Sequence, residues 1–399
     1  MDFSTILMYI KMMHTKNSKI AVFVLHVAKD YGILLKGCIL KKRNPGGSSM
    51  NHIDIATIDP NFNVSESFGR EDVLLRNCRE EPFSIHGVFW SEGKFRRMPR
   101  EVAEATSTGV TALHTHTAGG RVRFITDSPF VAIKAEQPAQ GRMCHFAFAG
   151  SAGFDLYADG VYKKTYLPTM DNTKGVIGIV DLGERKKRQI MIDFPLYSHV
   201  SELYIGLAPD ALLEKAPDYR YSLPAVFYGS SITQGGCASR PGTCYQAPLS
   251  RRFDLDYINL GFSGNAKGED SMIEYLASLP MSIFFLDYDH NAPSVEHLAA
   301  THEKLFLAFR ATHPDTPVIM MTRPKAILTA DEVERRAVVE TTYRNARARG
   351  DKNVYFLDGA ALTALCGNEG TVDGGHPTDY GFAAMTKALI ELIESEHIL

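Results

Sequence analysis

The sequence predicts an α/β protein of two domains, a β-sandwich followed by a parallel sheet with helices on both faces. Two observations support this fold class. In the first half, segments of alternating polarity such as 121–128, 131–134 and 189–194 are separated by Gly, Asp and Pro turns, which is typical of antiparallel strands. From residue 223 onward, short apolar runs alternate with helical stretches, which indicates a parallel sheet of about five strands.

Apolar runs define the strands that we expect in the second domain. They are 223–228, 257–261, 283–288, 318–322 and 354–358. A final helix is expected over 380–393, where apolar residues recur at helical spacing. The polar stretch 210–222 contains Pro217 and is the expected junction, so we predict domains over 50–215 and 216–399.

Candidate catalytic residues lie where predicted strands end. The strand over 223–228 runs into Gly229-Ser230-Ser231, so Ser231 is expected at the carboxyl end of a strand, where open α/β sheets bind ligands. Asp373 and His376 lie in a Gly-rich loop just before the last helix. A serine needs an imidazole to take its proton and a carboxylate to orient that imidazole, and these three residues supply all three groups.

Two further loops offer groups that could stabilise an oxyanion. The strand over 257–261 leads into a loop with Gly264, whose backbone N–H is a candidate donor. The strand over 283–288 ends in polar residues that include Asn291, whose side-chain amide is a second candidate. We therefore expect three loops from three strand ends to converge on one site.

These four blocks, in this order, resemble the SGNH (GDSL-type) hydrolase family of esterases and deacetylases over about residues 221–397. The resemblance implies a flavodoxin-like three-layer α/β/α domain. It also implies Ser231 as nucleophile, Gly264 and Asn291 as oxyanion donors, and Asp373 with His376 as the closing pair. No cofactor is implied, because the protein supplies the nucleophile and the donors.

Two departures from the family pattern affect individual residues. The usual Gly-Asp-Ser is Gly229-Ser230-Ser231, so Ser230 is the alternative nucleophile, although Ser231 holds the family position. The third block lacks the glycine of the usual Gly-x-Asn-Asp and reads Asp-Tyr-Asp-His-Asn over 287–291. Asn291 is therefore the residue carried over on the least evidence.

The segment Gly153-Phe-Asp-Leu-Tyr157 resembles the Gly-x-Asp-Leu-Tyr domain that precedes the hydrolase in one bacterial SGNH subgroup. This implies a jelly-roll-like sandwich and, by the likeness of such architectures to carbohydrate esterases, an acetylated sugar as substrate. An O-acyltransferase with the same nucleophile, or a carbohydrate-binding protein with an inactive hydrolase domain, are the alternatives.

Composition excludes some classes of partner. The 399 residues carry a net charge of −3, with 22% charged and 45% hydrophobic residues, so neither nucleic acid nor a membrane surface is expected as a partner. The six cysteines form no CxxC motif, and we expect free thiols in a cytoplasmic protein, with Cys237 and Cys244 as the one pair that could bridge. The first 49 residues contain an apolar run over 20–28 but no cleavage motif, and we interpret them as an upstream extension.

Three other features have competing interpretations. His114 and His116 would share one side of a strand and are interpreted as a surface or interface pair rather than as metal ligands. Arg323 follows a strand and is interpreted as an ion-pair partner more readily than as a substrate contact. Trp90 is the only tryptophan, and core burial is at least as well supported as sugar stacking.

Overall fold

The computed structural model describes residues 55–59, 62–64, 66–170 and 175–399. The chain forms two units, residues 1–63 and 64–399. In the first unit the short helix α3 (Ile55–Ile58) is described. The predicted extension over 1–49 lies outside the described residues, and the domain boundaries at 49/50 and 215/216 stay predictions.

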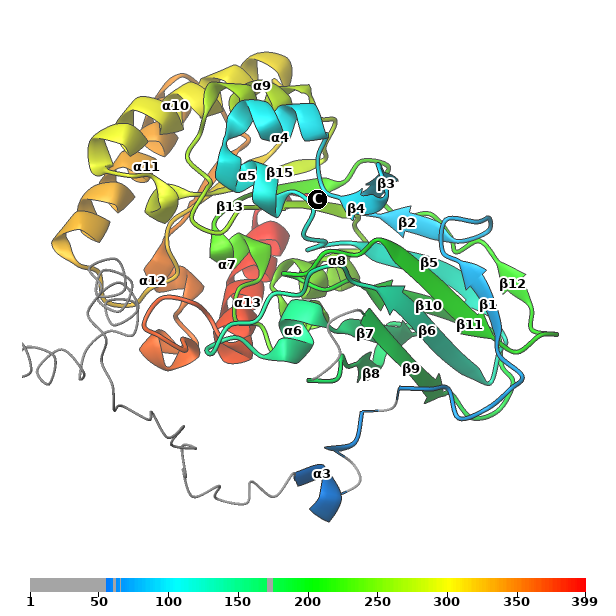
Figure 1. Cartoon of the computed structure of the whole chain (residues 1–399). Helices are drawn as coiled ribbons and strands as arrows, with labels where there is room; N and C mark the ends of the chain where they lie inside the picture. Colours follow the sequence, from blue (N-terminus) through cyan, green and yellow to red (C-terminus); the bar gives the residue numbers. More distant parts are fainter. Residues whose placement is uncertain (1–54, 60–61, 65, 171–174) are drawn as a thin grey trace, which may run out of the picture. The chain divides into compact units, whose positions relative to one another are not determined.

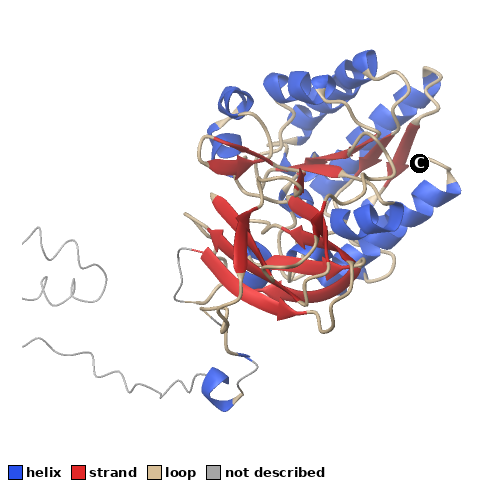
Figure 2. Ribbon diagram, turned by 90° about the vertical axis from the view of Figure 1, so that its right-hand side faces the viewer, coloured by secondary structure: helices blue, strands red, loops and turns tan. Residues whose placement is uncertain are grey.

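The N-terminal part of the second unit is a sandwich of two antiparallel sheets (Figures 1 and 2). One sheet has the order β1 (Leu74–Asn77), β11 (Glu202–Leu207), β6 (Phe130–Glu136), β9 (Gly175–Asp181). The other has the order β12 (Leu213–Glu214), β5 (Arg121–Thr126), β10 (Arg188–Asp193), β7 (Phe154–Ala158), β8 (Val161–Tyr166), with β2 (Ser84–His86) also paired to β5. A separate hairpin pairs β3 (Phe89–Ser91) with β4 (Lys94–Arg96). Alternate residues such as Ile190 and Ile192 are fully buried between the sheets, which confirms the predicted sandwich.

The C-terminal part is a parallel sheet whose strand order is that of a flavodoxin-like fold. The order is β14 (Tyr257–Gly261), β13 (Ala225–Gly229), β15 (Ile283–Asp287), β16 (Val318–Met321), β17 (Val354–Leu357). Each strand lies where an apolar run predicts it, within about two residues. The predicted α/β class and the five-stranded parallel sheet are confirmed.

Helices cover both faces of this sheet, because its strands are apolar on both sides. Val226 and Tyr228 face one core, and Phe227 faces the other. The first core is closed by α9 (Asp270–Ser278), α10 (Val295–Thr312) and α11 (Ala330–Ala348). The second is closed by α8 (Gln246–Phe253), α12 (Gly359–Leu362) and α13 (Asp379–Ser395). In the described residues no helix is long and apolar enough to cross a membrane.

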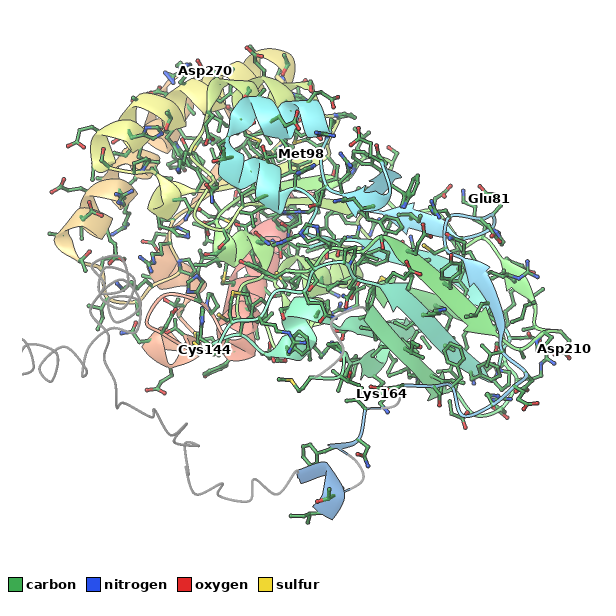
Figure 3. The ribbon with its side chains drawn as sticks, in the orientation of Figure 1. Glu81, Met98, Cys144, Lys164, Asp210 and Asp270 are labelled. Carbon is green, nitrogen blue, oxygen red and sulfur yellow. The ribbon has the colours of Figure 1, made fainter. Side chains whose placement is uncertain are left out.

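Two short helices from the N-terminal half belong to the core of the parallel-sheet domain. They are α4 (Arg100–Thr106) and α5 (Thr108–Leu113), drawn in cyan beside α9 in Figure 1. Met98, labelled beneath α4 in Figure 3, is fully buried in that core together with Ala103 and Val110. The chain therefore contributes two helices to the core of the second domain before the last strands of the sandwich are formed. No local pattern in the sequence indicates this arrangement.

The sandwich contains a buried carboxylate without a hydrogen-bond partner among the described residues. Asp193 is 3% exposed, and neither carboxylate oxygen is paired. Burial is the main cause that raises its pKa to about 6, although the guanidinium of Arg251 works in the opposite direction. The folded state therefore binds a proton more tightly than the unfolded state does, so stability is higher below the unfolded pKa and is lost as the pH rises through about 6.

We expect Asp193→Asn to raise the free energy of unfolding by about 3 kcal/mol at neutral pH, because it removes the cost of ionising this group. Urea unfolding at neutral pH and at about pH 5 measures the effect, and the gain should shrink at the lower pH. Asp218→Asn, at an exposed aspartate, is the control. A variant as stable as the wild type at both pH values would show that folding does not raise the pKa of Asp193.

Candidate active site

The turn after β13 presents Ser231 at the start of the short helix α7 (Ser231–Gln234). Ser230 is the N-cap of this helix, and its hydroxyl accepts a hydrogen bond from the N–H of Ile232 at 3.1 Å. Glycines are required where α7 packs on the strands. A Cβ at Gly229 would lie 2.2 Å from the carbonyl oxygen of Asp287, and one at Gly261 would lie 2.1 Å from the nitrogen of Gln234.

The structure brings Ser231, His376 and Asp373 into one hydrogen-bonded chain. Ser231 Oγ lies 2.9 Å from His376 Nε2, and His376 Nδ1 lies 2.8 Å from Asp373 Oδ2. Ser231 is 8% exposed, and the His376 side chain is 31% exposed, so the junction between them is open to solvent on one side. This is the geometry by which an imidazole accepts a serine proton while a carboxylate orients the ring.

The loop that carries Asp373 also stabilises its charge. Its Oδ1 accepts hydrogen bonds from the backbone N–H groups of His376 at 2.8 Å and Gly375 at 3.0 Å. Partial burial raises the pKa of this carboxyl, but these two bonds and the bond from the His376 ring outweigh it and lower the pKa to about 2. Asp373 is therefore ionised at neutral pH and holds the imidazole with Nδ1 protonated.

Three N–H groups in the loops that follow β13, β14 and β15 have no hydrogen-bond partner within the described ranges. They belong to the backbones of Ser231 and Gly264 and to the side-chain amide of Asn291. The amide oxygen of Asn291 accepts from the N–H of Ala266 at 3.4 Å, which leaves the NH₂ group of Asn291 unpaired. Gln234 on α7 accepts from the N–H of Ser263 at 3.1 Å, so the loop before Gly264 is tied to the serine helix. The arrangement leaves these three donors available to an oxyanion.

A second histidine contacts the neighbouring serine. His290 Nε2 lies 2.5 Å from Ser230 Oγ, and His290 Nδ1 lies 2.9 Å from Asp289 Oδ1. Ser230 is fully buried and already caps α7, whereas Ser231 is 8% exposed and its Oγ meets His376. The geometry therefore favours Ser231 over Ser230 as the nucleophile. Asp289 and His290, which belong to the unusual third block, link the loop of Asn291 to the turn of Ser231.

The Gly-x-Asp-Leu-Tyr segment lies on β7 and forms hydrogen bonds with the loop that follows α7. Asp155 is fully buried, and its Oδ2 accepts from Arg240 at 2.6 Å and from the N–H of Gly242 at 2.8 Å. The hydroxyl of Tyr157 lies 2.7 Å from the same Arg240 nitrogen. A side chain at Gly242 would collide with this tyrosine, since its Cβ would lie 2.2 Å from the hydroxyl oxygen.

The same loop is hydrogen-bonded to Asp379, the first residue of α13, which lies three residues after His376. The N–H of Ser239 donates to Asp379 Oδ1 at 2.9 Å, and the hydroxyl of Thr243 donates to that oxygen at 2.7 Å. A continuous set of hydrogen bonds thus runs from Asp155 through the 239–243 loop to the segment that carries His376. No local pattern in the sequence indicates this role, because the partners are more than 80 residues apart along the chain.

We expect Asp155→Asn to lower kcat by roughly 10- to 100-fold with little change in KM, because a small displacement of the loop moves His376 relative to Ser231. Steady-state kinetics well below the melting temperature of each variant measures this. Thr165→Val is the matched control, since it removes the bond at 2.7 Å to Asp155 Oδ1 and a contact with the Tyr162 hydroxyl, but leaves the bonds of Asp155 to the 239–243 loop in place. If both variants lose stability but keep the wild-type kcat, the contacts of Asp155 serve folding alone.

Three minor predictions have different outcomes. The expectation of a strand at His114 and His116 is wrong, because His114 caps the end of α5; His116 nevertheless lies at an interface, with its Nδ1 3.1 Å from Gln234 Nε2. Arg323 forms the expected ion pair, at 2.8 Å from Glu332. Trp90 is 38% exposed, so the expectation of core burial is wrong.

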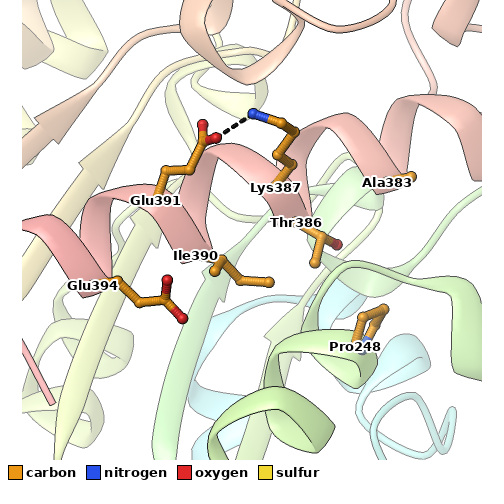
Figure 4. Close-up of a pocket in the computed structure, with 7 residues that line it drawn as sticks. All are labelled: Pro248, Ala383, Thr386, Lys387, Ile390, Glu391 and Glu394. Carbon is orange, nitrogen blue, oxygen red and sulfur yellow. Dashed lines mark hydrogen bonds and ion pairs between the residues drawn. The ribbon is translucent and has the colours of Figure 1, made fainter.

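A surface groove of about 470 Å³ lies between α8 and α13, and none of the candidate catalytic residues lines it (Figure 4). Pro248 and Ile390 form its apolar floor, and the ion pair of Lys387 with Glu391 borders it. The groove is therefore not part of the site around Ser231. The described cysteines, Cys237 and Cys244 included, are free thiols.

Comparisons with known proteins show the family of this chain. Residues 222–394 match the model of the GDSL-like lipase/acylhydrolase family, and residues 75–213 match the GxDLY model, which is described as the N-terminus of Esterase_SGNH_hydro-type. The chain belongs to this SGNH subgroup, in which a GxDLY domain precedes the hydrolase domain. Its family places it among the carboxylic ester hydrolases. A search of curated proteins gave no match.

Solved structures share both domains. A putative GDSL-like lipase from Bacteroides ovatus is 29% identical with a TM-score of 0.72, covering 82% of this chain and 98% of its own. A salicylyl-acyltransferase from a tetracycline biosynthetic pathway is 21% identical with a TM-score of 0.69, covering 83% and 99%. An acetyl xylan esterase from Butyrivibrio proteoclasticus is 12% identical with a TM-score of 0.54, covering 82% and 99%. At these two lower identities the likeness concerns the fold alone.

Proposed function

We propose that the protein hydrolyses short-chain acyl esters, acetyl esters first, on a carbohydrate. The observation that carries the proposal is the hydrogen-bonded chain from Ser231 through His376 to Asp373. The likeness of the fold to an acetyl xylan esterase and to family two carbohydrate esterases supports the choice of an acetylated sugar.

In the proposed reaction, Ser231 Oγ attacks the ester carbonyl carbon while its proton passes to His376 Nε2. The imidazolium that forms is stabilised by the ionised Asp373, and the carbonyl oxygen becomes an oxyanion. The backbone N–H groups of Ser231 and Gly264 and the amide of Asn291 donate to that oxyanion. His376 returns the proton to the leaving alcohol, and an acyl-enzyme remains. A water molecule, deprotonated by the same imidazole, then releases the acid and restores the serine.

Hydrolysis of p-nitrophenyl acetate compared with longer-chain p-nitrophenyl esters tests the acyl preference. We expect kcat/KM to be highest for acetate and to fall as the chain lengthens. Acetylated oligosaccharides, followed by release of acetate, then test the sugar. A preference for long chains, or no acetate released from any acetylated sugar while p-nitrophenyl acetate is cleaved, would contradict the proposal.

Acyl transfer is a second candidate, because a salicylyl-acyltransferase has the same two-domain fold. The acyl-enzyme does not dictate its acceptor, so a sugar hydroxyl could replace water. Product analysis with and without an added sugar acceptor separates the two reactions. Acylated sugar formed at the expense of free acid would favour transfer, and unchanged acid release would favour hydrolysis.

A further inference from the structure

Two side chains that the reaction does not use converge on His376. His145 lies in the segment before α6 (Phe148–Ala152) of the sandwich, and Cys237 lies in the loop after α7. One donor atom from each of His145, Cys237 and His376 lies within 4.8 Å of the other two. The ring centroids of His145 and His376 are 5.8 Å apart. Imidazole nitrogen and cysteine sulfur atoms from three separate segments thus meet at the candidate base.

Neither of the two additional side chains has a hydrogen-bond partner in the part of the chain that the structure describes. His145 is exposed, and its ring lies against the ring of His376. Cys237 is a free thiol. Cys237 also has a φ of +75°, a left-handed backbone conformation that non-glycine residues rarely adopt. Two unpaired ligand groups, one of them held in a strained conformation, are therefore directed at one imidazole.

We propose that His145, Cys237 and His376 form an inhibitory Zn²⁺ site. Zinc prefers nitrogen and sulfur ligands in a tetrahedral arrangement, and three protein ligands leave the fourth position to water. On binding, the Cys237 thiol releases its proton to solvent and becomes a thiolate ligand, while the two histidines bind as neutral imidazoles. No electron transfer is involved.

Coordination of zinc by either nitrogen of His376 prevents the proton transfer from Ser231. Nε2 bonds to Ser231 and Nδ1 to Asp373, so a metal at Nε2 removes the proton acceptor and a metal at Nδ1 removes the orienting carboxylate. The bond that is lost at Nε2 involves a neutral hydroxyl and is weak beside the binding of zinc by three ligands. Magnesium prefers oxygen ligands and is not expected to inhibit.

The loss of activity on metal binding rests on the proposed function, whereas the binding itself does not. Two experiments therefore separate them. The first measures hydrolysis of p-nitrophenyl acetate by the reduced full-length protein against ZnCl₂ and against MgCl₂. We expect inhibition by zinc alone, reversed by EDTA. Cys237→Ser and His145→Gln should each raise the inhibitory zinc concentration by at least about tenfold.

The control for the first experiment is Cys144→Ser. Cys144 is exposed, precedes His145 directly and is labelled at the surface in Figure 3. This variant should be inhibited like the wild type. Equal inhibition of the wild type, Cys237→Ser and His145→Gln would overturn the proposal, because zinc would then bind elsewhere.

The second experiment uses Co²⁺ as a spectroscopic substitute for zinc and requires no activity. The wild type and Ser231→Ala should both develop the absorption of a cobalt–thiolate bond, and added Zn²⁺ should abolish it. Cys237→Ser should lack this absorption, whereas Cys144→Ser should retain it. Its absence in the wild type would overturn the metal site. Its presence in a protein that cleaves no ester would leave the site standing and contradict the proposed function instead.

Discussion

Ser231→Ala is expected to lower kcat/KM for p-nitrophenyl acetate by at least about 10⁴-fold, because it removes the group that forms the acyl-enzyme. Ser231 Oγ is also the atom that meets His376 Nε2 at 2.9 Å, so no other described serine can take its place without a rearrangement. Steady-state kinetics, with intact mass after treatment with a fluorophosphonate, measures both turnover and covalent labelling. The wild type should gain one adduct and the variant none.

The control for this substitution is Ser230→Ala, which tests the departure of the first block from the family pattern. Ser230 is fully buried, caps α7 and contacts His290, so its loss should cost about 1 kcal/mol of stability as a helix cap. Fluorophosphonate labelling should persist in this variant. If Ser230→Ala loses the adduct and Ser231→Ala keeps it, the nucleophile has been assigned one residue too far along the chain.

Asn291→Ala is expected to lower kcat by about 10²- to 10³-fold with KM nearly unchanged, because an oxyanion donor acts mainly in the transition state. The unpaired NH₂ group of Asn291 is the basis for this expectation, since its amide oxygen is already bonded to the N–H of Ala266. The same kinetic assay measures the effect. An Asn291→Ala enzyme with unchanged turnover would show that the third block is wrongly placed.

A matched variant distinguishes loss of the donor from damage to the loop. Asn291→Asp keeps an oxygen that can accept from Ala266 but offers no N–H, so it should lose as much activity as Asn291→Ala. The melting temperatures of the two variants should stay close to that of the wild type. Recovery of activity in Asn291→Asp would mean that the contact to Ala266, and not the donor, is what turnover requires.

The strands were predictable because their signals are local. Each buried strand of the parallel sheet is a short apolar run, such as Ile283–Asp287, and the polar residues that follow it mark its carboxyl end. Parallel strands share one edge at their carboxyl ends, so Ser231, Gly264 and Asn291 were expected together. The fold class and the family follow from these patterns, and the structure and the comparisons confirm both.

Other features depend on contacts between distant segments and have no periodic signal. The helices α4 and α5 lie in the N-terminal half but pack in the core around the parallel sheet, and Trp90 is exposed although its type favours burial. The sequence indicates only that His290 lies in a loop, and the fold alone places its ring between Asp289 and Ser230. The strand expected at 114–116 is not formed, because His114 caps the end of α5 and His116 makes only an isolated β-bridge with His199.

The sequence by itself determined the fold class, the strand ends, the two adjacent candidate serines and the candidate base and donors, since residue type and spacing along one segment are sufficient for each. The tertiary structure alone decided which of two adjacent serines meets His376, that Asp155 holds the loop beside it, and that His145 and Cys237 lie against the same ring. These relations join residues about 80 to 230 positions apart. At such separations, only the packing of the two domains brings the side chains together.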